Sequence, residues 1–356
     1  MVRRQTDVFE VSSGLARLGW KAVRSLYYRG ASDGMFGKLY KGIRGRADYN
    51  RPGLTLNALA GGIRPAILNS QDTVVVAHPT LVAILRGHRD LVYQHGEVVA
   101  PDESIVKGAN YVLVPTDTVA KSFVAGGYDE SRVIVTGLCI EPSLVRVARE
   151  SFEARVLRIN GQGPLTGAFF SSGAEPKTHV KSLVAAAVYA ANSGGRAILF
   201  ARRGGFFQQY AAAKFGESRI QYMSVGSADG LPSELPEAMV VLYESRRELN
   251  AFTTSLFRYF DYFVSPSHER TNWALGLGLP MFVVGPCYGP FAPQNRDILL
   301  KSGVADVLDT PVSAVGFGDK LTAMRQHGVL SDMAHAGIGK FDINGFEKAA
   351  EFLTAE

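Results

Sequence analysis

The sequence predicts an α/β protein built on parallel β-sheets, and three observations support this class. The stretch Asp261–Val284 has the pattern of one strand-loop-helix-strand unit: an apolar run stops at Pro266, a helix-length segment ends at Gly278, and a second apolar run begins after Pro280. Units of this kind recur along the chain, and repeated strand-then-helix units form parallel sheets with right-handed crossovers. The 356 residues, 46% hydrophobic and 20% charged, suffice for two ordinary cores.

The first half of the chain contains short β-prone runs that end in polar residues at turns. The pattern predicts, in order, a strand over 6–11, a basic helix over 15–27, a helix over 54–63, and strands over 72–77, 91–93, 111–114 and 132–136. We expect residues 1–145 to form an N-terminal α/β domain.

The second half repeats the same alternation after a partly helical linker over 141–163. The pattern predicts strands over 164–170, 197–201, 239–243, 262–264 and 281–284, with helices over 179–192 and 247–259 among them. We expect residues 146–356 to form a C-terminal domain that faces the first across a cleft.

Composition and motifs exclude several classes of protein. There is no apolar run of about 18 residues and no hydrophobic signal segment after Met1, so we expect a cytoplasmic protein. The two cysteines are too few for a disulfide framework, and the seven histidines show no metal-ligand spacing, so we expect no metal. A P-loop, a Gly-x-Gly-x-x-Gly fingerprint and a Gly-x-Ser-x-Gly elbow are also absent from the sequence.

The basic residues concentrate at the N-terminal end of the chain. Residues 1–64 hold twelve Lys or Arg against four Asp or Glu, within a formal net charge of +5. An apolar stripe at helical spacing lies among them: Leu15, Leu18, Gly19, Ala22, Val23, Leu26 and Tyr27. Amphipathic stripes more often face a core, which is the favoured interpretation; the alternative is a helix that rests on an anionic membrane.

The order of these motifs resembles GT-B glycosyltransferases of family 28, which add N-acetylglucosamine to a polyprenyl-linked peptidoglycan precursor or hexoses to diacylglycerol. The resemblance covers residues 72–308. It rests on Asp261, Ser265–Ser267, Thr271, Gly278-Leu279-Pro280 and Gln294-Asn295, and on the strand ends His78-Pro79, His95 with Glu97, Val114–Thr116 and Val135–Gly137.

This resemblance implies two Rossmann-like domains and a metal-independent hexosyltransferase. The enzyme would move a sugar from a nucleotide sugar, with UDP as the expected nucleotide, to a lipid-linked or glycan acceptor. The nucleotide sugar would be a co-substrate, and no separate cofactor is expected.

Two features depart from the family pattern. Family members begin with a strand and a Gly-rich loop, whereas residues 6–11 already resemble their second strand, so the first strand-helix unit is missing or divergent. Trp273 stands where the family has a glutamate that holds the ribose hydroxyls. Glu269 could replace that carboxylate from the neighbouring loop.

The donor site is expected at the carboxyl ends of the second domain's strands, where ligands of open α/β sheets bind. Small and polar residues there would hold the diphosphate, with Tyr243 near the base and Gln294 and Asn295 at the sugar; Asn295 could instead cap its helix. The diphosphate-binding candidates are Ser171, Ser172, Gly173, Ser267, His268, Glu269, Arg270 and Thr271.

The acceptor hydroxyl needs a general base, and strand-end residues of the first domain are the candidates. His95 and Glu97 are the first choice and His78 the second. A strand-end histidine and glutamate that cap the next turn are an equally good interpretation.

Two alternatives to a transferase remain open on the sequence alone. One is a GT-B-shaped binding subunit without catalysis that needs a protein partner; the other is an enzyme like the nucleotide-sugar 2-epimerases. The expected ligand is a nucleotide sugar, and no nucleic acid is expected. The membrane alternative for the basic segment implies a peripheral position on the inner face of the membrane.

Overall fold

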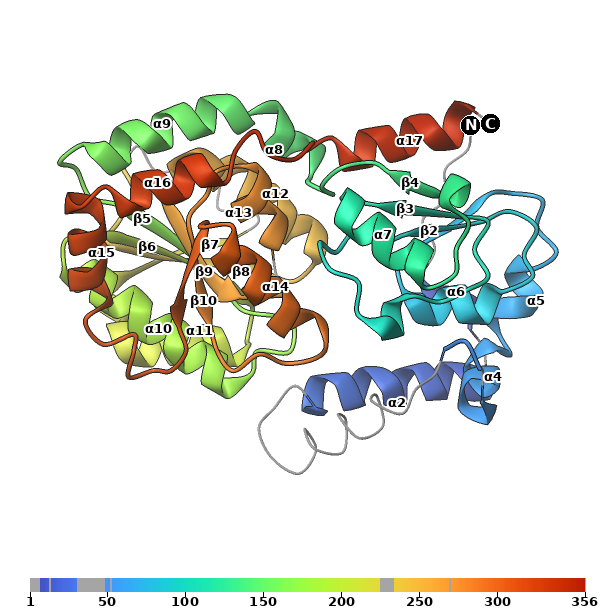
Figure 1. Cartoon of the computed structure of the whole chain (residues 1–356). Coiled ribbons are helices and arrows are strands. Elements are labelled where there is room, and N and C mark those ends of the chain that lie inside the picture. Colours follow the sequence, from blue (N-terminus) through green and yellow to red (C-terminus); the bar gives the residue numbers. More distant parts are fainter. Residues whose placement is uncertain are drawn as a thin grey trace. The chain divides into compact units, whose positions relative to one another are not determined.

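The computed structural model describes residues 7–12, 14–30, 49–51, 53–224, 234–268 and 270–355, which form two α/β units (Figure 1). The first unit consists of two segments, Met1–Cys139 and Gly345–Glu356, and the second unit is Ile140–Asn344. Each contains one parallel sheet, of four and seven strands, so the predicted α/β class with two Rossmann-like domains is confirmed.

The first unit is built on strands that follow one another in chain order. Their bounds are β1 Val74–Val76, β2 Leu91–Gln94, β3 Tyr111–Val114 and β4 Val133–Val135, in the sheet order β1-β2-β3-β4. The helices and 3₁₀ turns of this unit are α1 Val8–Val11, α2 Gly14–Gly30, α4 Leu54–Ala60, α5 Ile63–Ile67, α6 Pro79–Leu85, η1 Asp102–Ser104, α7 Asp117–Ala125, η2 Glu130–Arg132 and α17 Gly345–Ala355.

The two faces of this small sheet bury different helices. The side chains of Val76, Tyr93 and Val112 point into a core with α6 and α7. On the other face Val92 and Leu113 are covered by α17. Because strand side chains alternate between faces, one short sheet sustains both layers.

Two sequence expectations about this unit need correction. Val8–Val11 is a helical turn and not a strand, because the Asp7 carboxylate accepts from the Phe9 amide and caps it; Thr6 lies outside the described residues. The helix α17 was expected with the C-terminal domain, yet its apolar face packs on the first sheet.

The second unit has a seven-stranded sheet in the order β11-β10-β9-β5-β6-β8-β7. The strand bounds are β5 Thr166–Phe170, β6 Arg196–Arg202, β7 Ile220–Ser224, β8 Ala238–Tyr243, β9 Tyr262–Pro266, β10 Met281–Val284 and β11 Ala305–Leu308. The chain adds β6, β8 and β7 on one side of β5 and then returns to place β9 on the other side. The order therefore reverses between β5 and β9, and this switch point is where ligands of such sheets bind.

Helices cover both faces of the second sheet. They are α8 Pro142–Arg146, α9 Ala148–Asn160, α10 Lys177–Asn192, α11 Phe206–Phe215, α12 Arg246–Leu256, α13 Thr271–Gly276, α14 Phe291–Lys301, α15 Phe317–Gln326 and α16 Val329–Ala336, with η3 Glu217–Arg219 and η4 Phe257–Tyr259. None of the described helices of either unit combines the length and apolar character that a bilayer span requires.

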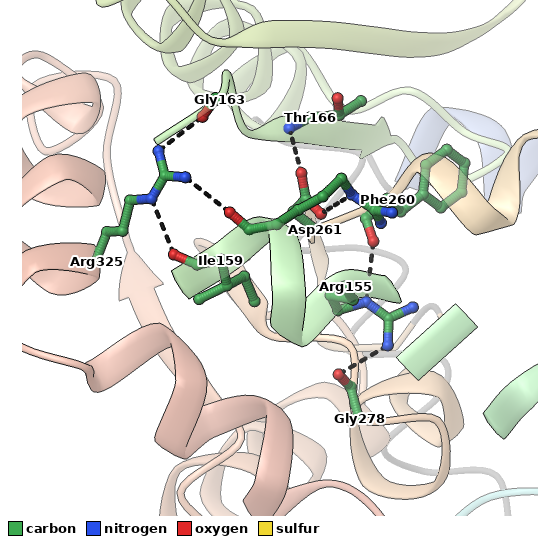
Figure 2. Close-up of polar contacts among 9 residues, drawn as sticks. Arg155, Ile159, Gly163, Thr166, Phe260, Asp261, Gly278 and Arg325 are labelled. Atoms are coloured by element: carbon green, nitrogen blue, oxygen red, sulfur yellow. Dashed lines mark hydrogen bonds and ion pairs between the residues drawn. The ribbon is translucent and has the colours of Figure 1, made fainter. Parts of the chain in front are cut away.

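Buried charges join the strands at the amino edge of this sheet (Figure 2). The Asp261 carboxylate accepts from the Thr166 amide (2.8 Å) and from Arg158 Nε (2.7 Å), which ties β9 to β5 and α9. Arg155 is fully buried and donates to the carbonyls of Phe260 and Gly278; burial lowers the pKa of its guanidinium to about 9. Asp261, which opens the sequence motif, therefore supports the fold at the edge opposite to the switch point.

Candidate functional site

The candidate site lies at the carboxyl edge of the second sheet, at the switch point between β5 and β9. These two strands pair in parallel, with Phe169 beside Val264. Their following loops therefore leave the sheet at one edge, as do the loops after β6 and β10. The sequence placed most donor-site candidates in these loops.

The loop after β5 is small, buried and leads directly into a long helix. Ser171 and Ser172 are buried, and the N-cap residue of the 16-residue helix α10 is Pro176, whose side chain makes no cap hydrogen bond. The Ser171 hydroxyl oxygen is buried without a hydrogen-bond partner among the described residues. Such a group costs free energy unless a ligand or water satisfies it, so it marks a candidate contact.

The loop after β9 uses its hydroxyls to hold itself in place. Ser267 Oγ donates to the Ala292 carbonyl at the start of α14 (2.7 Å), and Thr271 Oγ1 donates to the Ser267 carbonyl (3.1 Å). Both hydroxyls thus shape the loop, and contact of Ser267 and Thr271 with a diphosphate stays a prediction.

Two histidines and a tyrosine gather beside these loops. The rings of His179, at the start of α10, and His268, after β9, have centroids 6.3 Å apart. His179 Nε2 donates to the Pro286 carbonyl (2.7 Å), and the Tyr288 ring lies 4.9 Å from the His179 ring. Tyr288 also exchanges a hydrogen bond with Thr178 (3.0 Å). Three of these residues were not identified as site candidates from the sequence: Thr178, His179 and Tyr288. The start of the predicted helix at His179 carries no recognisable motif.

Arg270 is half-buried, and its guanidinium lies close to two aromatic rings. Its Cζ atom is 4.0 Å from the Phe170 ring centroid and 5.1 Å from that of Trp273. A guanidinium packed against aromatic rings keeps its positive charge at the site. This charge suits an anionic ligand.

Trp273, at the position of the family's ribose-binding glutamate, has a structural role in the core. Its side chain is buried among Phe170, Phe257 and Phe263, and its indole N–H donates to the Glu141 carboxylate (3.2 Å). Glu269, the expected replacement carboxylate, lies outside the described residues.

Gln294 and Asn295 lie within α14 and not in the loop before it. The helix begins at Phe291, and Pro293 is tolerated because it stands in the first turn. Gln294 is exposed and Asn295 is fully buried, so the two side chains do not share one environment.

Tyr243 ends β8, two strands away from β5 in the sheet order. Its carbonyl accepts from the Arg203 amide after β6 (3.0 Å). It therefore lies at the same edge as the switch point, and its contact with a base stays a prediction.

Glu175 is a site residue that the sequence did not reveal. It has a left-handed backbone (φ 46°), and its Oε2 accepts from the Phe207 amide in the first turn of α11 (3.0 Å). Burial raises the pKa of this carboxyl above its ordinary value. Gly205 makes room for it, because a Cβ there would lie 2.7 Å from Glu175 Oε2. The contact fastens the β5 loop to the β6–α11 loop.

The acceptor-side candidates belong to the first unit. His95 is buried, with Nε2 donating to the Val99 carbonyl (2.8 Å) and Nδ1 next to the Tyr93 hydroxyl (3.1 Å). Burial lowers the pKa of its imidazole to about 4. Both ring nitrogens are thus engaged in the fold, which favours a structural role over that of a general base.

The other two base candidates differ from His95 in exposure. His78 is exposed, and its Nδ1 accepts from the Thr80 amide (3.2 Å) as the cap of α6. Glu97 is half-buried near Tyr93 and Cys139. Neither assignment is tested by this geometry. Over the described parts of both units, no cluster of three His, Cys, Asp or Glu could hold a metal ion.

Comparisons with known proteins agree on the fold. No family model matches the sequence, and no curated protein matches it. Among solved structures, the UDP-GlcNAc 2-epimerase from Neisseria meningitidis bound to UDP-GlcNAc has a TM-score of 0.55 at 12% identity, over 87% of this chain and 84% of that one.

Two further structures are similar at the same level. A putative UDP-N-acetylglucosamine 2-epimerase from Listeria monocytogenes has a TM-score of 0.55 at 14% identity, over 85% of this chain and 79% of that one. The S. aureus MnaA-UDP structure has a TM-score of 0.53 at 12% identity, over 98% and 86%. These likenesses show a GT-B fold, and the assignment to family 28 stays a prediction.

Proposed function

We propose that the second unit binds a nucleotide sugar, with UDP as the nucleotide, at the switch point between β5 and β9, and that the protein is a metal-independent glycosyltransferase. One observation carries the proposal: Ser171 presents a buried hydroxyl without a partner among the described residues, in the small loop that leads into α10. The first amides of a helix attract a phosphate. Arg270, on its aromatic rings, would add a positive charge to stabilise the departing diphosphate.

The fold neighbours support this choice of ligand. Two of the structures described above were solved with UDP-GlcNAc or with UDP. The first unit would supply the acceptor side, and the acceptor would be a lipid-linked sugar or a glycan. Of the predicted base candidates, Glu97 and His78 remain for the deprotonation of the acceptor hydroxyl.

The helix α2 supports a lipid-linked acceptor at a membrane surface. Leu18 and Val23 from the apolar stripe are exposed (60% and 42%), whereas Trp20, which lies off the stripe, donates its indole N–H to the Leu59 carbonyl of α4. The exposed side chains of Arg17 and Lys21 flank them. An apolar stripe between cations is the pattern of a helix that rests on anionic lipid, on the inner face of the membrane.

A 2-epimerase is the second candidate, because two histidines flank the site and could serve as acid and base. The His179 and His268 rings lie 6.3 Å apart. Incubation with UDP-GlcNAc alone separates the two reactions: an epimerase forms the 2-epimer without any acceptor, and a transferase releases UDP only when an acceptor is present. A binding subunit gives neither product.

Ser171→Ala tests the donor site directly. Loss of one neutral hydrogen bond should weaken UDP binding by about 0.5–1.5 kcal/mol, while the ligand-free protein keeps its stability because the hydroxyl has no partner among the described residues to lose. Calorimetric titration with UDP and UDP-GlcNAc measures the first effect, and thermal unfolding the second.

Ser182→Ala is the matched control. Ser182 lies in α10, fully buried, and its hydroxyl likewise has no partner among the described residues. This variant should behave like Ser171→Ala in stability and like the wild type in UDP binding. Equal UDP affinities in all three proteins would count against the site. If none of the three binds UDP, the alternative of a GT-B-shaped binding subunit without catalysis is favoured.

A further inference from the structure

The second unit has a cavity of about 740 Å³ at the amino edge of its sheet, opposite to the proposed nucleotide site. Its walls are the turn between α9 and β5 (residues 159–165), the turn between α10 and β6 (193–195), and the face of α15 from Gly318 to Gln326. Tyr262 at the start of β9 lines it from the sheet. All of these segments belong to one unit.

Glycines among the lining residues help to leave this space open. Glycines occupy both turns, and Gly163 and Gly194 have open space where a Cβ would be. Gly318 allows α15 to approach α10, since a Cβ there would overlap the Ser193 side chain.

The electrostatics of the cavity select a neutral ligand. Arg325 is its one charged lining residue within the described chain, and its guanidinium donates to the carbonyls of Ile159 (2.9 Å), Gly163 (2.8 Å) and Arg158 (2.7 Å); Figure 2 labels the first two of these partners. The C-terminal ends of α9, α10 and α15 also point here, and helix C-termini repel anions. Among the described lining residues, no carboxylate offers a partner to a cation.

The polar lining is made of amides and hydroxyls. Asn160, Gln162 and Gln326 present exposed side-chain amides, and Ser193 and Thr322 present hydroxyls. The apolar side chains of Leu165 and Leu321 lie between them. Groups that both donate and accept, next to small apolar surfaces, match a molecule whose hydroxyls alternate with C–H groups.

Tyr262 supplies an independent observation that points to a ligand. Its side chain is fully buried, its hydroxyl has no hydrogen-bond partner among the described residues, and it lines the cavity. A buried tyrosine hydroxyl normally finds a partner. Gly167 on the neighbouring strand makes room for the ring, since a Cβ there would overlap it.

We infer that this cavity is a second binding site, for a neutral oligosaccharide, on the opposite edge of the sheet from the nucleotide. The Tyr262 hydroxyl would bond the sugar at the floor of the cavity, and the amides of the two turns would bond hydroxyls at its rim. This inference does not depend on the nucleotide site, and a sugar bound here would be an anchored glycan chain and not a reacting group.

The test uses the full chain with maltotriose and chitotriose as neutral probes and sulfated maltotriose as the anionic control, by calorimetry and hydrogen exchange. We expect binding of at least one neutral trisaccharide, with slowed amide exchange at residues 159–165 and 193–195. Tyr262→Phe should keep the fold, because it removes a hydroxyl that bonds to no residue in the described part of the chain, and should weaken binding by roughly three- to tenfold.

Thr322→Trp is the steric counterpart, since Thr322 is exposed on α15 and a large ring there fills the cavity. It should abolish trisaccharide binding and leave UDP affinity unchanged. The inference is overturned if no neutral trisaccharide binds at millimolar concentration, if the sulfated probe binds best, or if neither variant alters the affinity. Loss of UDP binding alone would overturn the proposed function and leave this site standing.

Discussion

At the scale of single residues, His95 shows how burial changes the role of a titratable side chain. From its sequence position alone, a histidine at the end of a strand is a candidate general base. In the structure its ring is held between Tyr93 and the Val99 carbonyl, and Phe123 packs on it at 5.1 Å between centroids. The imidazole is therefore kept neutral by the fold.

This predicts a pH dependence of stability. The pKa of His95 falls from an unfolded value near 6.5 to about 4 on folding, so the neutral form stabilises the native state above pH 6.5. As pH falls from 6.5 to 4, up to about 3 kcal/mol of this stability is lost. The unfolding free energies of wild type and His95→Gln, measured in urea from pH 7.5 to 4, should therefore converge as pH falls.

His327→Gln serves as the control, because His327 is exposed after α15. Comparison of the two variants separates the loss of the buried imidazole from the loss of a histidine in general. A constant difference for His95→Gln would show that His95 titrates freely and would reopen its role as a base.

Trp273 gives a second residue-scale prediction. A glutamate at this position would place a carboxylate among Phe170, Phe257 and Phe263 and beside Glu141. Loss of a buried large aromatic side chain costs about 3–5 kcal/mol, and an unpaired buried charge adds to this. Trp273→Glu should therefore unfold at much lower urea, and no ribose contact should result.

Trp273→Phe separates packing from the hydrogen bond. It keeps a ring in the cluster and loses the bond to Glu141, so it should cost about 1–3 kcal/mol. Circular dichroism is the suitable probe, since the variants remove one of two tryptophans. A Trp273→Glu protein with wild-type stability and tighter UDP binding would instead support the family's ribose carboxylate.

The sequence predicted where the site residues stand in the chain but not what their side chains contact. Ser171 and Arg270 were correctly placed in loops at strand ends. Sequence spacing could not show that Thr271 bonds to its own loop or that Glu175 reaches α11, because both contacts depend on how neighbouring loops turn. His179 could not be found, since a histidine that opens a helix carries no signal of its own.

At the scale of elements, α17 is the clearest case for a quantitative test. Phe352 lies on the sheet side of this helix, with its ring 5.0 Å from that of Tyr111, whereas Phe346 is 44% exposed. Phe352→Ala should destabilise the first unit by about 1–3 kcal/mol, part of the usual cost for a fully buried phenylalanine. Hydrogen exchange at β2 and β3 measures the effect.

Phe346→Ala is the matched control on the same helix. An exposed substitution of this kind changes stability by no more than about 0.5 kcal/mol. Similar exchange rates in the two variants would mean that α17 does not support the first sheet.

Strongly periodic elements were predicted well, and short or edge elements were not. The strands β2, β3, β5, β6, β8 and β10 and the helices α2 and α10 correspond closely to the expected ranges. The turn at α1 was mistaken for a strand, because four residues carry too little periodicity to outweigh a capping aspartate. The edge strand β7 and helix α11 have mixed patterns and were missed.

At the scale of the whole molecule, the chain makes two parallel sheets from one continuous alternation of strands and helices. The number of sheets followed from chain length and repeated units. The return of Gly345–Glu356 to the first unit could not be predicted, since an amphipathic helix fits any apolar sheet face of the right width.

The whole-molecule charge distribution leads to the last prediction. The sequence carries a formal net charge of +5, and residues 1–64 alone carry an excess of eight, from twelve Lys or Arg and four Asp or Glu. On α2, Arg17 and Lys21 are exposed beside Leu18 and Val23. Each cation near an anionic surface contributes about 1 kcal/mol, so the double variant Arg17→Glu with Lys21→Glu should lower vesicle binding by at least 30-fold, or roughly 2 kcal/mol.

Flotation with phosphatidylserine-containing and pure phosphatidylcholine vesicles measures this binding. The wild type should float with the anionic vesicles and lose binding as salt increases, because screening weakens charge attraction. A second double variant, Arg149→Glu with Lys301→Glu, makes the same charge change at exposed positions of the second unit and should float like the wild type. Equal flotation with both kinds of vesicle, or with neither, would contradict a membrane role for α2, because its cations would then add nothing to binding.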